Sequence, residues 1–462
     1  MASTYLTKTF AQAGNRKKFT ISTWVKRSEL IAQGSSAQQD IIACSTGSST
    51  FAILYFASNN DSLTYYEAGG GATQAYIDHS ASTNFKLTDS NAWYHIVFTH
   101  DSTQNTASDR LKMYVNGTQL TPSNSTYPSQ DHDSLFNTAI RHDIGAQGAG
   151  FANGTAAFNG YMSHFHFCDG YAYSPSDFGS TDSVTGEWQI NTSPSVSYGT
   201  NGFFVLKNGN SVTDQSPNTN NFTVGGGTLT KTEDNPSNNF ATGNLLIGIH
   251  SNGSVLVPHT YSNGNLTSTS SGQQWRIHQS TLGASSGKYY AEFKLISNSG
   301  TWYSYVGIYD LDAYAQKISG YPYMADMANC YGLYNGNGNV WSGASNTSYG
   351  VSYGAGNIIG IAMDLDNNKL YFSKDGTWMN SANPSNGTGG YSITADKTYA
   401  FGIQQYAQNS IVWSANYGNG YIGTTEITTN TGTGYQDADG NGRFYYAVPT
   451  NFRCLSTKGL NQ

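Results

Sequence analysis

The chain has 462 residues, enough for two to four domains that each bury a sizeable core. Only 11% of its residues are charged, against about 25% in an average soluble domain, and the formal net charge is −7. This composition argues against nucleic-acid binding, which needs clustered Lys and Arg, and no apolar run approaches the length of a membrane span. With 52 Gly and 34 Tyr, the surface is expected to carry amides, hydroxyls and phenols, which suit neutral ligands or neighbouring subunits.

The N-terminal part of the sequence predicts antiparallel strands that bury one face. Apolar and polar residues alternate there, which is the period of a half-buried strand. The alternating sets are Phe19, Ile21, Thr23 and Val25; Tyr94, Ile96 and Phe98; Leu111, Met113 and Val115; and Gly160-Tyr-Met-Ser-His-Phe-His-Phe167. Asn116-Gly117 follows the third set and predicts a type I′ hairpin turn.

The same segments resemble a known family. In order they read Phe19-Thr-Ile-Ser-Thr-Trp-Val25, Trp93-Tyr-His-Ile-Val-Phe98, Leu111-Lys-Met-Tyr-Val-Asn-Gly117 and Phe158-Asn-Gly-Tyr-Met162. This order is similar to that of laminin-G or concanavalin-A-like jelly rolls. The resemblance covers about residues 15 to 178 and implies a first β-sandwich domain at residues 1–178.

The middle of the chain, residues 179–245, differs in residue pattern from the segments on either side. One apolar run, Phe203-Phe-Val-Leu206, is flanked by turn-rich pieces such as Asp214-Gln-Ser-Pro-Asn218 and Gly225-Gly-Gly227. We interpret this segment as a small β and loop extension that packs on the first domain. The boundary to the next domain is expected near Thr242-Gly-Asn244.

The strongest local pattern lies in the C-terminal half. Ile359, Ile361, Met363 and Leu365 alternate with small or acidic residues; Asn367-Asn368 can turn the chain; and Leu370 and Phe372 resume the alternation. Asp375-Gly376 then predicts a second tight turn. The segment is therefore expected to form two paired antiparallel strands followed by another turn.

This hairpin looks like the signature hairpin of the SPRY family, a β-sandwich interaction module. Further segments match the family in order: Gly287-Lys-Tyr-Tyr-Ala-Glu-Phe293, Tyr305-Val-Gly-Ile-Tyr309, Cys330-Tyr-Gly-Leu-Tyr334, Val340-Trp-Ser-Gly343, Tyr399-Ala-Phe-Gly-Ile403 and Ile411-Val-Trp-Ser-Ala-Asn416. The resemblance implies a second sandwich at residues 246–462 that binds partners and catalyses nothing. The whole chain is thus expected to be all-β, with two antiparallel sandwiches and helix confined to short turns.

The C-terminal tail suggests where such a protein works. Residues 444–457 resemble the end of SPRY-containing proteins of tailed bacteriophages, especially marine ones. The N-terminus lacks the apolar core of a signal peptide, which fits a virion protein assembled in the host cytoplasm. The expected function is therefore that of a non-enzymatic fibre, tail or capsid-decoration protein that aids host attachment. Its expected partners are other virion proteins, a host glycan or receptor and further copies of itself, with a trimer as the working guess.

Two alternative functions remain open. The first is a secreted or cell-surface lectin, which the missing signal peptide disfavours. The second is a tail-borne polysaccharide depolymerase, since jelly rolls of this kind include hydrolases. Such enzymes need paired carboxylates about 5 to 9 Å apart, which the hydrolase branch places as Glu-x-Asp-x-Glu. None of the six glutamates, Glu29, Glu67, Glu187, Glu233, Glu292 and Glu426, is followed two residues later by Asp.

The candidate ligand-binding residues are aromatic. In SPRY domains the binding face consists of loops at one end of the sandwich, and the corresponding loops here carry Tyr321, Tyr323, Tyr349 and Trp378. Rigid aromatic rings beside Asn, Ser and Gly suit stacking on sugar rings or anchoring a protein. Trp341 and Trp413 lie in strand-like runs and are expected to pack in the core.

No metal or cofactor is expected. Asp437-Ala-Asp-Gly-Asn-Gly442 imitates the start of a calcium loop, but its twelfth position is Val448 in place of the required Glu. Asp131, Asp133 and Asp143 are possible calcium ligands at a sandwich rim, and a solvated loop is the favoured interpretation. Cys44, Cys168, Cys330 and Cys454 form no CxxC pair. Buried free thiols are favoured over one disulfide in each domain.

Overall fold

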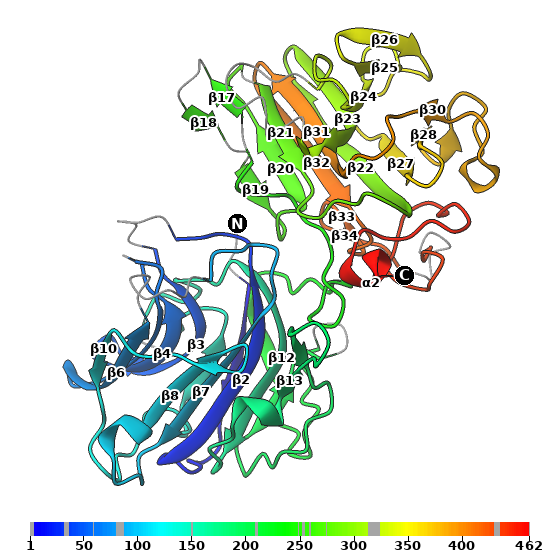
Figure 1. The fold of residues 1–462 in the computed structure, drawn as a ribbon. Coiled ribbons are helices and arrows are strands. Elements are labelled where there is room, and N and C mark those ends of the chain that lie inside the picture. Colours follow the sequence, from blue (N-terminus) through cyan, green and yellow to red (C-terminus); the bar gives the residue numbers. More distant parts are fainter. Residues whose placement is uncertain are drawn as a thin grey trace. The chain divides into compact units, whose positions relative to one another are not determined.

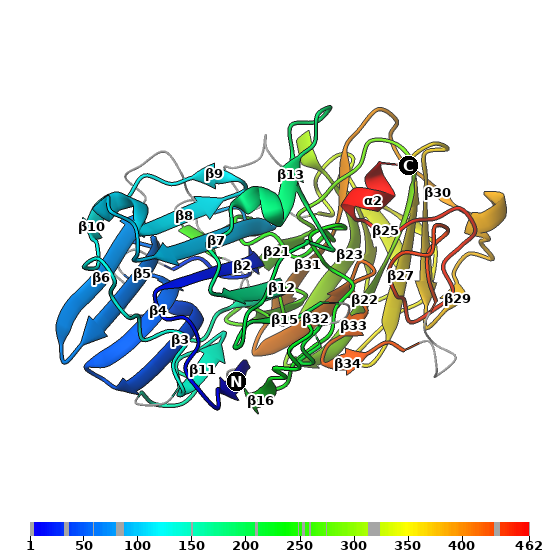
Figure 2. The same cartoon turned by 90° about the horizontal axis from the view of Figure 1, so that it is seen from below.

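The computed structural model describes residues 4–31, 37–58, 60–79, 87–148, 151–207, 211–247, 249–251, 255–257, 260–273, 275–312, 324–428 and 435–461. The chain divides into two compact units, Met1–Lys231 and Thr232–Gln462, called here the first and the second unit. Each is a β-sandwich built from two main antiparallel sheets (Figures 1 and 2). No helix in the described ranges is long and apolar enough to cross a membrane.

The first unit packs an eight-stranded sheet against a six-stranded sheet. In spatial order the larger sheet holds β10 (Asn124–Thr126), β6 (Ala72–His79), β5 (Leu63–Gly69), β4 (Thr50–Phe56), β3 (Gln39–Gly47), β11 (Arg141–Ile144), β1 (Tyr5–Thr9) and β16 (Thr223–Gly226). The smaller sheet holds β15 (Phe203–Val205), β12 (Gly160–Asp169), β2 (Lys18–Arg27), β7 (Tyr94–Asp101), β8 (Leu111–Val115) and β9 (Thr118–Gln119). A separate hairpin joins β13 (Gly179–Thr181) to β14 (Trp188–Ile190).

The strand predictions for the first unit are confirmed, with one local difference. Its core contains the apolar members of all the alternating sets of β2, β7 and β8. Asn116 and Gly117 have φ values of 47° and 79°, as a type I′ turn requires. In β12 the register shifts between Ser163 and His166, and His164 has a φ of 49°. This β-bulge brings both Met162 and Phe165 to the core, which simple alternation would not do.

The apolar run of the middle segment packs on the first unit, as predicted. Residues 203–205 form β15, which pairs with β12, and residues 223–226 form β16, which pairs with β1. Phe203, Val205 and Leu206 lie in the first core. The boundary differs from the one expected near residues 242–244, because the units divide between Lys231 and Thr232. The middle segment therefore contributes to both units.

The second unit has the same two-layer plan. Its larger sheet holds, in spatial order, β19 (Thr260–Ser262), β20 (Thr267–Ser270), β32 (Ser410–Asn416), β22 (Lys288–Ser299), β27 (Ile358–Asp364), β28 (Lys369–Lys374) and β29 (Thr377–Trp378), with β30 (Tyr391–Ser392) also paired to β28. Its smaller sheet holds β21 (Trp275–Gln279), β31 (Tyr399–Ala407), β23 (Trp302–Asp310), β24 (Tyr331–Tyr334), β25 (Asn339–Ser342) and β26 (Ser345–Ser348).

The remaining elements are short. Two small hairpins join β17 (Ile249–Ser251) to β18 (Val255–Val257) and β33 (Tyr421–Ile422) to β34 (Thr425–Glu426). The helical elements with assigned bounds are η1 (Ala107–Asp109), η2 (Pro175–Asp177), η3 (Pro384–Asn386) and α2 (Thr457–Leu460). The chain is thus nearly all-β, as the sequence predicts.

The predicted C-terminal hairpin is present as β27 and β28. Ile359, Ile361 and Met363 of β27 and Leu370 and Phe372 of β28 all lie in the core between the two sheets. The second turn, Asp375-Gly376, has φ values of 50° and 79° and leads into β29.

The outer faces of the two sheets of the second unit are covered differently. The C-terminal segment packs on the larger sheet, where Phe444, Phe452 and Cys454 form a second apolar cluster with Tyr290 and Tyr371. On the smaller sheet, residues 324–330 cover one part, because Met324, Met327 and Cys330 pack there against Ile277 and Tyr309. The rest of that outer face carries the site described next.

Candidate binding site

The structure describes two of the four predicted contact residues, Tyr349 and Trp378, and does not bring these two together into a site. Tyr321 and Tyr323 lie outside the described residues. Tyr349 is only 6% exposed, packs in the core and donates a hydrogen bond from its hydroxyl to the Gly389 carbonyl at 3.0 Å. Its prediction as a surface contact is wrong, because a buried ring offers no face to a ligand. Trp378 is half-buried against the cluster beneath the C-terminal segment, with its ring 6.3 Å from that of Tyr290.

The two tryptophans expected in the core differ in their burial. Trp413 is fully buried, which confirms the prediction. Trp341 is half-buried on the outer face of the smaller sheet, with ring centroids 6.4 Å from Tyr305 and 6.5 Å from Tyr334. Neighbouring side chains of a strand point to opposite faces of the sheet. Val340 packs in the core, so Trp341 points outward.

Trp341 belongs to a larger group that we call the aromatic platform. It consists of six aromatic side chains on the outer face of the smaller sheet, one or two from each of five neighbouring strands. The members are Trp275 on β21, Tyr406 on β31, Tyr303 and Tyr305 on β23, Tyr334 on β24 and Trp341 on β25.

Strand register explains why these residues lie together. Trp275 is paired with Tyr406, and Tyr406 is paired with Tyr303, so the three stand in one row across three strands. Residues paired across an antiparallel ladder point to the same face of the sheet. Val306 and Ile308 lie in the core, which leaves Tyr303 and Tyr305 on the outer face of β23.

The rings of the platform are in mutual contact. The Trp275 centroid lies 6.2 Å from that of Tyr303, with the planes at 20°, and 5.6 Å from that of Tyr406. The rings of Tyr303 and Tyr406 are 5.9 Å apart, and those of Tyr305 and Tyr334 are 5.1 Å apart. Tyr303 is 39% exposed, and the other five are half-buried. The platform is therefore held by its own packing and, at Trp275 and Tyr305, by the apolar cluster that includes Met324 and Met327, while it still presents aromatic surface to solvent.

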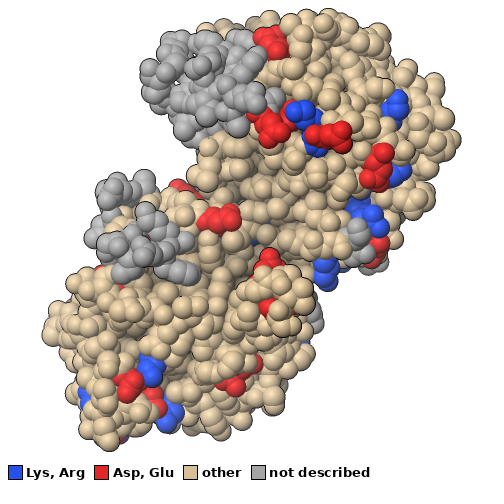
Figure 3. Space-filling model, in the orientation of Figure 1, with Lys and Arg blue, Asp and Glu red and all other residues tan. Residues whose placement is uncertain are grey.

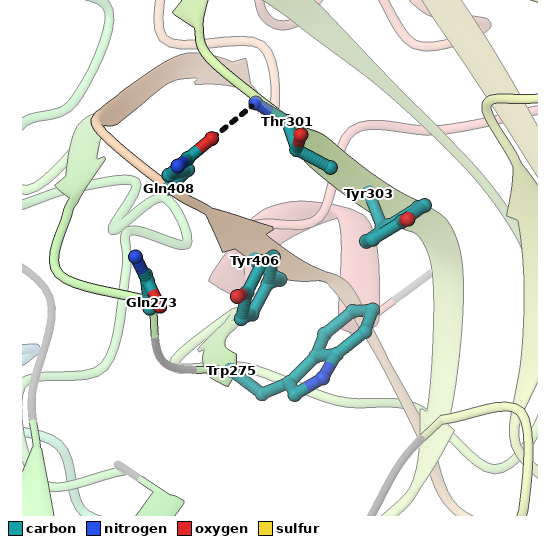
Figure 4. Close-up of a pocket in the computed structure, with 6 residues that line it drawn as sticks. All are labelled: Gln273, Trp275, Thr301, Tyr303, Tyr406 and Gln408. Carbon is teal, nitrogen blue, oxygen red and sulfur yellow. Dashed lines mark hydrogen bonds between the residues drawn. The ribbon is translucent and has the colours of Figure 1, made fainter.

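A shallow pocket opens at one end of the platform. Its cavity volume is about 300 Å³, and it is lined by Trp275, Tyr303, Tyr406, Thr301, Gln273 and Gln408 (Figure 4). The Gln408 carbonyl oxygen accepts a hydrogen bond from the Thr301 backbone N–H at 3.3 Å, which positions this side chain at the rim. Aromatic faces beside neutral amide and hydroxyl groups match what a sugar presents, namely apolar C–H faces and hydroxyls.

Two tyrosines of the platform have raised pKa values. Burial, together with the neighbouring Tyr334 and Asp326, raises the pKa of Tyr305 to about 12. Burial and Tyr303 also raise the pKa of Tyr334. The phenols of Tyr305 and Tyr334 can therefore donate and accept hydrogen bonds at neutral pH.

Sequence reasoning missed the platform although the signal was present. Tyr303 and Tyr305 stand two positions apart, which is the spacing of side chains on one face of a strand. Alternation alone does not say which face is covered, and the contact between β21, β31 and β23 joins residues more than a hundred positions apart. That information is in the topology and not in any local motif.

Two of the three candidate calcium ligands at the sandwich rim pair with basic side chains, and the third, Asp133, is exposed. Asp131 pairs with Lys17 at 3.3 Å, and Asp143 pairs with Arg141 at 2.8 Å. Asp437 accepts hydrogen bonds from the backbone of Asp439, Asn441 and Cys454, as a tight turn requires. Within the described parts of the chain, no group of three or more His, Cys, Asp or Glu is placed to hold a metal ion.

The two buried glutamates have structural contacts. Glu67 accepts hydrogen bonds from the Tyr65 hydroxyl at 2.6 Å, the Ser134 hydroxyl at 2.8 Å and the Leu135 N–H at 2.8 Å. Glu292 accepts from the backbone N–H groups of Tyr445 at 2.8 Å and Tyr446 at 2.7 Å. Cys44, Cys168, Cys330 and Cys454 are all buried free thiols, as expected.

Comparison with solved structures finds similarity for parts of the chain. The SPRY domain of human HERC1 is 16% identical, with 34% of this chain and 91% of that chain covered and a TM-score of 0.28. A heptameric SAP-like pentraxin from Limulus polyphemus is 15% identical, with 37% and 72% covered and a TM-score of 0.26. A search among curated proteins finds no match.

Two parts of the chain match known sequence families. Residues 2–177 match the laminin G family described as the concanavalin A-like lectin/glucanases superfamily. Residues 288–389 match the SPRY domain, and this range includes β22 to β29. The chain therefore combines an N-terminal concanavalin A-like domain with a C-terminal SPRY domain.

Proposed function

We propose that this chain is a non-enzymatic recognition protein of a bacteriophage particle, and that its aromatic platform binds surface polysaccharide. The platform is the observation that carries the proposal. Six aromatic rings in mutual contact lie on a sheet face, beside a pocket of about 300 Å³ rimmed by Gln273, Thr301 and Gln408. A lectin-type domain and a SPRY domain in one chain fit a binding role.

The carboxylates support recognition without cleavage. Glycoside hydrolysis needs an acid and a base placed across the scissile bond. The groups that line the platform pocket are aromatic rings, amides and a hydroxyl. Glu67 and Glu292 are buried and hold neighbouring segments by hydrogen bonds, so they are poorly placed to reach a substrate.

The buried thiols favour the virion over the secreted lectin. All four cysteines are free, whereas extracellular domains made in an oxidising compartment commonly form disulfides. Assembly in a host cytoplasm is consistent with this state. In this role the remaining surfaces of the chain contact other virion proteins.

The test of recognition uses the purified full chain and immobilised host-surface polysaccharide. Retention and released reducing ends are followed together. We expect retention without cleavage for the wild type and reduced retention for Tyr303→Ala and Tyr406→Ala. Tyr435→Ala is the matched control, because Tyr435 is a tyrosine of the same unit with 42% exposure that lies outside the platform.

Two results would contradict this function. Release of reducing ends by the wild type, abolished in a single Asp or Glu variant, would make the chain a depolymerase. Unchanged retention in a folded Tyr303→Ala, Tyr406→Ala double variant would remove the platform from the function. Location is tested separately, by electron microscopy of purified particles labelled with antibody to this chain.

A further inference from the structure

We infer that the aromatic platform takes an internal stretch of an uncharged polysaccharide, which lies across the strands from β21 towards β25. This inference rests on the proposed function and specifies its ligand. It follows from three properties of the outer face of the smaller sheet: its charge, its extent and the distribution of its hydrogen-bonding groups.

The first property is the absence of charge among the outward positions of the described strands. The register places three rows of paired residues on this face. They are Trp275, Tyr406 and Tyr303; Ile277, Gln404, Tyr305 and Tyr334; and Gln279, Gly402, Gly307, Gly332, Trp341 and Asn346. None of these residues is Asp, Glu, Lys, Arg or His, and two of them, Ile277 and Gln404, are buried beneath Met324.

An acidic polysaccharide would find no cation in these rows. It would instead meet Asp326, which is exposed and close enough to Tyr305 to raise the pKa of that phenol. Charge is sparse elsewhere too: on the face in view in Figure 3, Lys, Arg, Asp and Glu form scattered spots on an uncharged surface. The local field therefore favours a neutral polymer over a uronate or a sulfated one.

The second property is extent. From β21 to β25 there are four steps between neighbouring strands. At about 4.8 Å a step, the platform spans about 19 Å. A single sugar ring would cover the pocket at Trp275 and Tyr303 and leave Tyr334 and Trp341 without contact. A chain of several sugars can stack on both ends.

The third property is the distribution of polar groups along that length. Gln273 and Gln408 stand at the β21 end, and the phenols of Tyr303, Tyr305, Tyr334 and Tyr406 follow between the two tryptophans. Neutral amides and phenols can donate to and accept from sugar hydroxyls without a counter-ion. Among the described residues of this face, the polar groups are spread along its length and not gathered at one end, so the site suits the middle of a chain.

The experiment is calorimetric titration of the full chain with oligosaccharides of increasing length. Cello-oligosaccharides, laminari-oligosaccharides and manno-oligosaccharides of two to six units are the neutral probes, and alginate oligosaccharides of the same lengths are the acidic ones. We expect at least one neutral series to gain affinity about tenfold or more from two units to five, and the acidic series to bind more weakly at every length.

Variants locate the effect on the platform. Tyr303→Ala should weaken binding of short and long probes alike, whereas Trp341→Ala should weaken only the long ones. Asp326→Asn should reduce the difference in affinity between the neutral and the acidic probes. Tyr435→Ala should change nothing, and thermal unfolding of each variant checks that it is folded.

The outcomes separate this inference from the proposed function. Tightest binding of an alginate series, or affinity independent of length, would overturn the uncharged internal stretch while recognition by the platform stands. Equal loss of short and long probes in Trp341→Ala would also overturn the crossing direction. No retention on any immobilised host polysaccharide would refute the proposed function itself.

Discussion

Glu292 illustrates how one buried residue can hold a terminal segment. It lies on β22, is fully buried and points to the outer face of the larger sheet of the second unit. Besides the N–H groups of Tyr445 and Tyr446, it accepts hydrogen bonds from Asn416 at 3.1 Å and from the Tyr290 hydroxyl at 3.2 Å. This single carboxyl group therefore ties β22 to the C-terminal segment.

The pKa of Glu292 predicts a pH-dependent stability of the second unit. Burial raises this pKa to about 7, although the donors from Tyr445, Tyr446, Asn416 and Tyr290 oppose the rise. In the unfolded chain a Glu titrates near pH 4.3, so the folded state holds the proton more tightly. The stabilisation is fully present below pH of about 4.3 and is lost as the pH rises through about 7.

The measurement is denaturant unfolding of the full chain between pH 4.5 and 8. This group alone should lower the free energy of unfolding by about 1.4 kcal/mol per pH unit between its two pKa values. Glu292→Gln should reduce the dependence of the free energy of unfolding on pH. It should also lower that free energy by an amount that does not vary with pH, because it disturbs hydrogen bonds of the carboxyl group. A wild type whose second unit gains stability over the same range would contradict the prediction.

Tyr349 provides a test of the corrected site assignment. Its hydroxyl donates to the Gly389 carbonyl, which the Asn380 side-chain amide also reaches at 3.1 Å. Tyr349→Phe should therefore cost only about 1 kcal/mol of stability, and Tyr349→Ala about 3 to 5 kcal/mol. Neither variant should weaken polysaccharide binding once it is folded. Selective loss of binding in Tyr349→Phe would restore this residue as a contact.

At the scale of elements, the sequence predicted more of the fold than of the site. The sequence predicts local features, because each depends on neighbours in the chain. These are the two tight turns and the alternation in β2, β7, β8, β27 and β28. The bulge at His164 was not readable, since it depends on which residues face the opposite sheet. The platform was missed for the same reason, because its rows join β21, β31 and β23 across the chain.

The turn between β28 and β29 depends on the glycine at position 376. Gly376 has a φ of 79°, and a Cβ at this position would approach the Tyr446 ring to within 2.6 Å. Gly376→Ala should thus strain the turn and displace the C-terminal segment, which costs about 1 to 3 kcal/mol. Gly354→Ala is the matched control, because it has open space around its Cα and no left-handed φ. Chemical denaturation of both variants checks this, and equal stability would contradict it.

At the scale of the whole molecule, the weakly charged surface predicts association. An isolated soluble monomer usually carries more charge than 11% of its residues, so we expect a homo-oligomer, with a trimer as the specific expectation. Light scattering of the purified chain should give a mass near three times 49.8 kDa. A mass of 49.8 kDa at high concentration, without association with particles, would contradict the expectation.

The division into units predicts where the chain can be cut. Each unit has its own main core, so the fragments 1–231 and 232–462 should fold separately, and the second should keep the polysaccharide affinity of the full chain. Circular dichroism, thermal unfolding and titration of each fragment test this. Failure of either fragment to fold would show that the units depend on each other.

The boundary expected from sequence is the matched control for that cut. A fragment that begins at residue 246 lacks Phe240, which is 1% exposed and packs with Phe444 beneath the C-terminal segment. It also lacks Ala241, whose N–H donates to the Leu455 carbonyl at 2.9 Å. Loss of a buried aromatic ring costs about 3 to 5 kcal/mol, so fragment 246–462 should unfold at a lower temperature than fragment 232–462. Equal unfolding temperatures would mean that residues 232–245 act as a linker and that the sequence-based boundary is the better one.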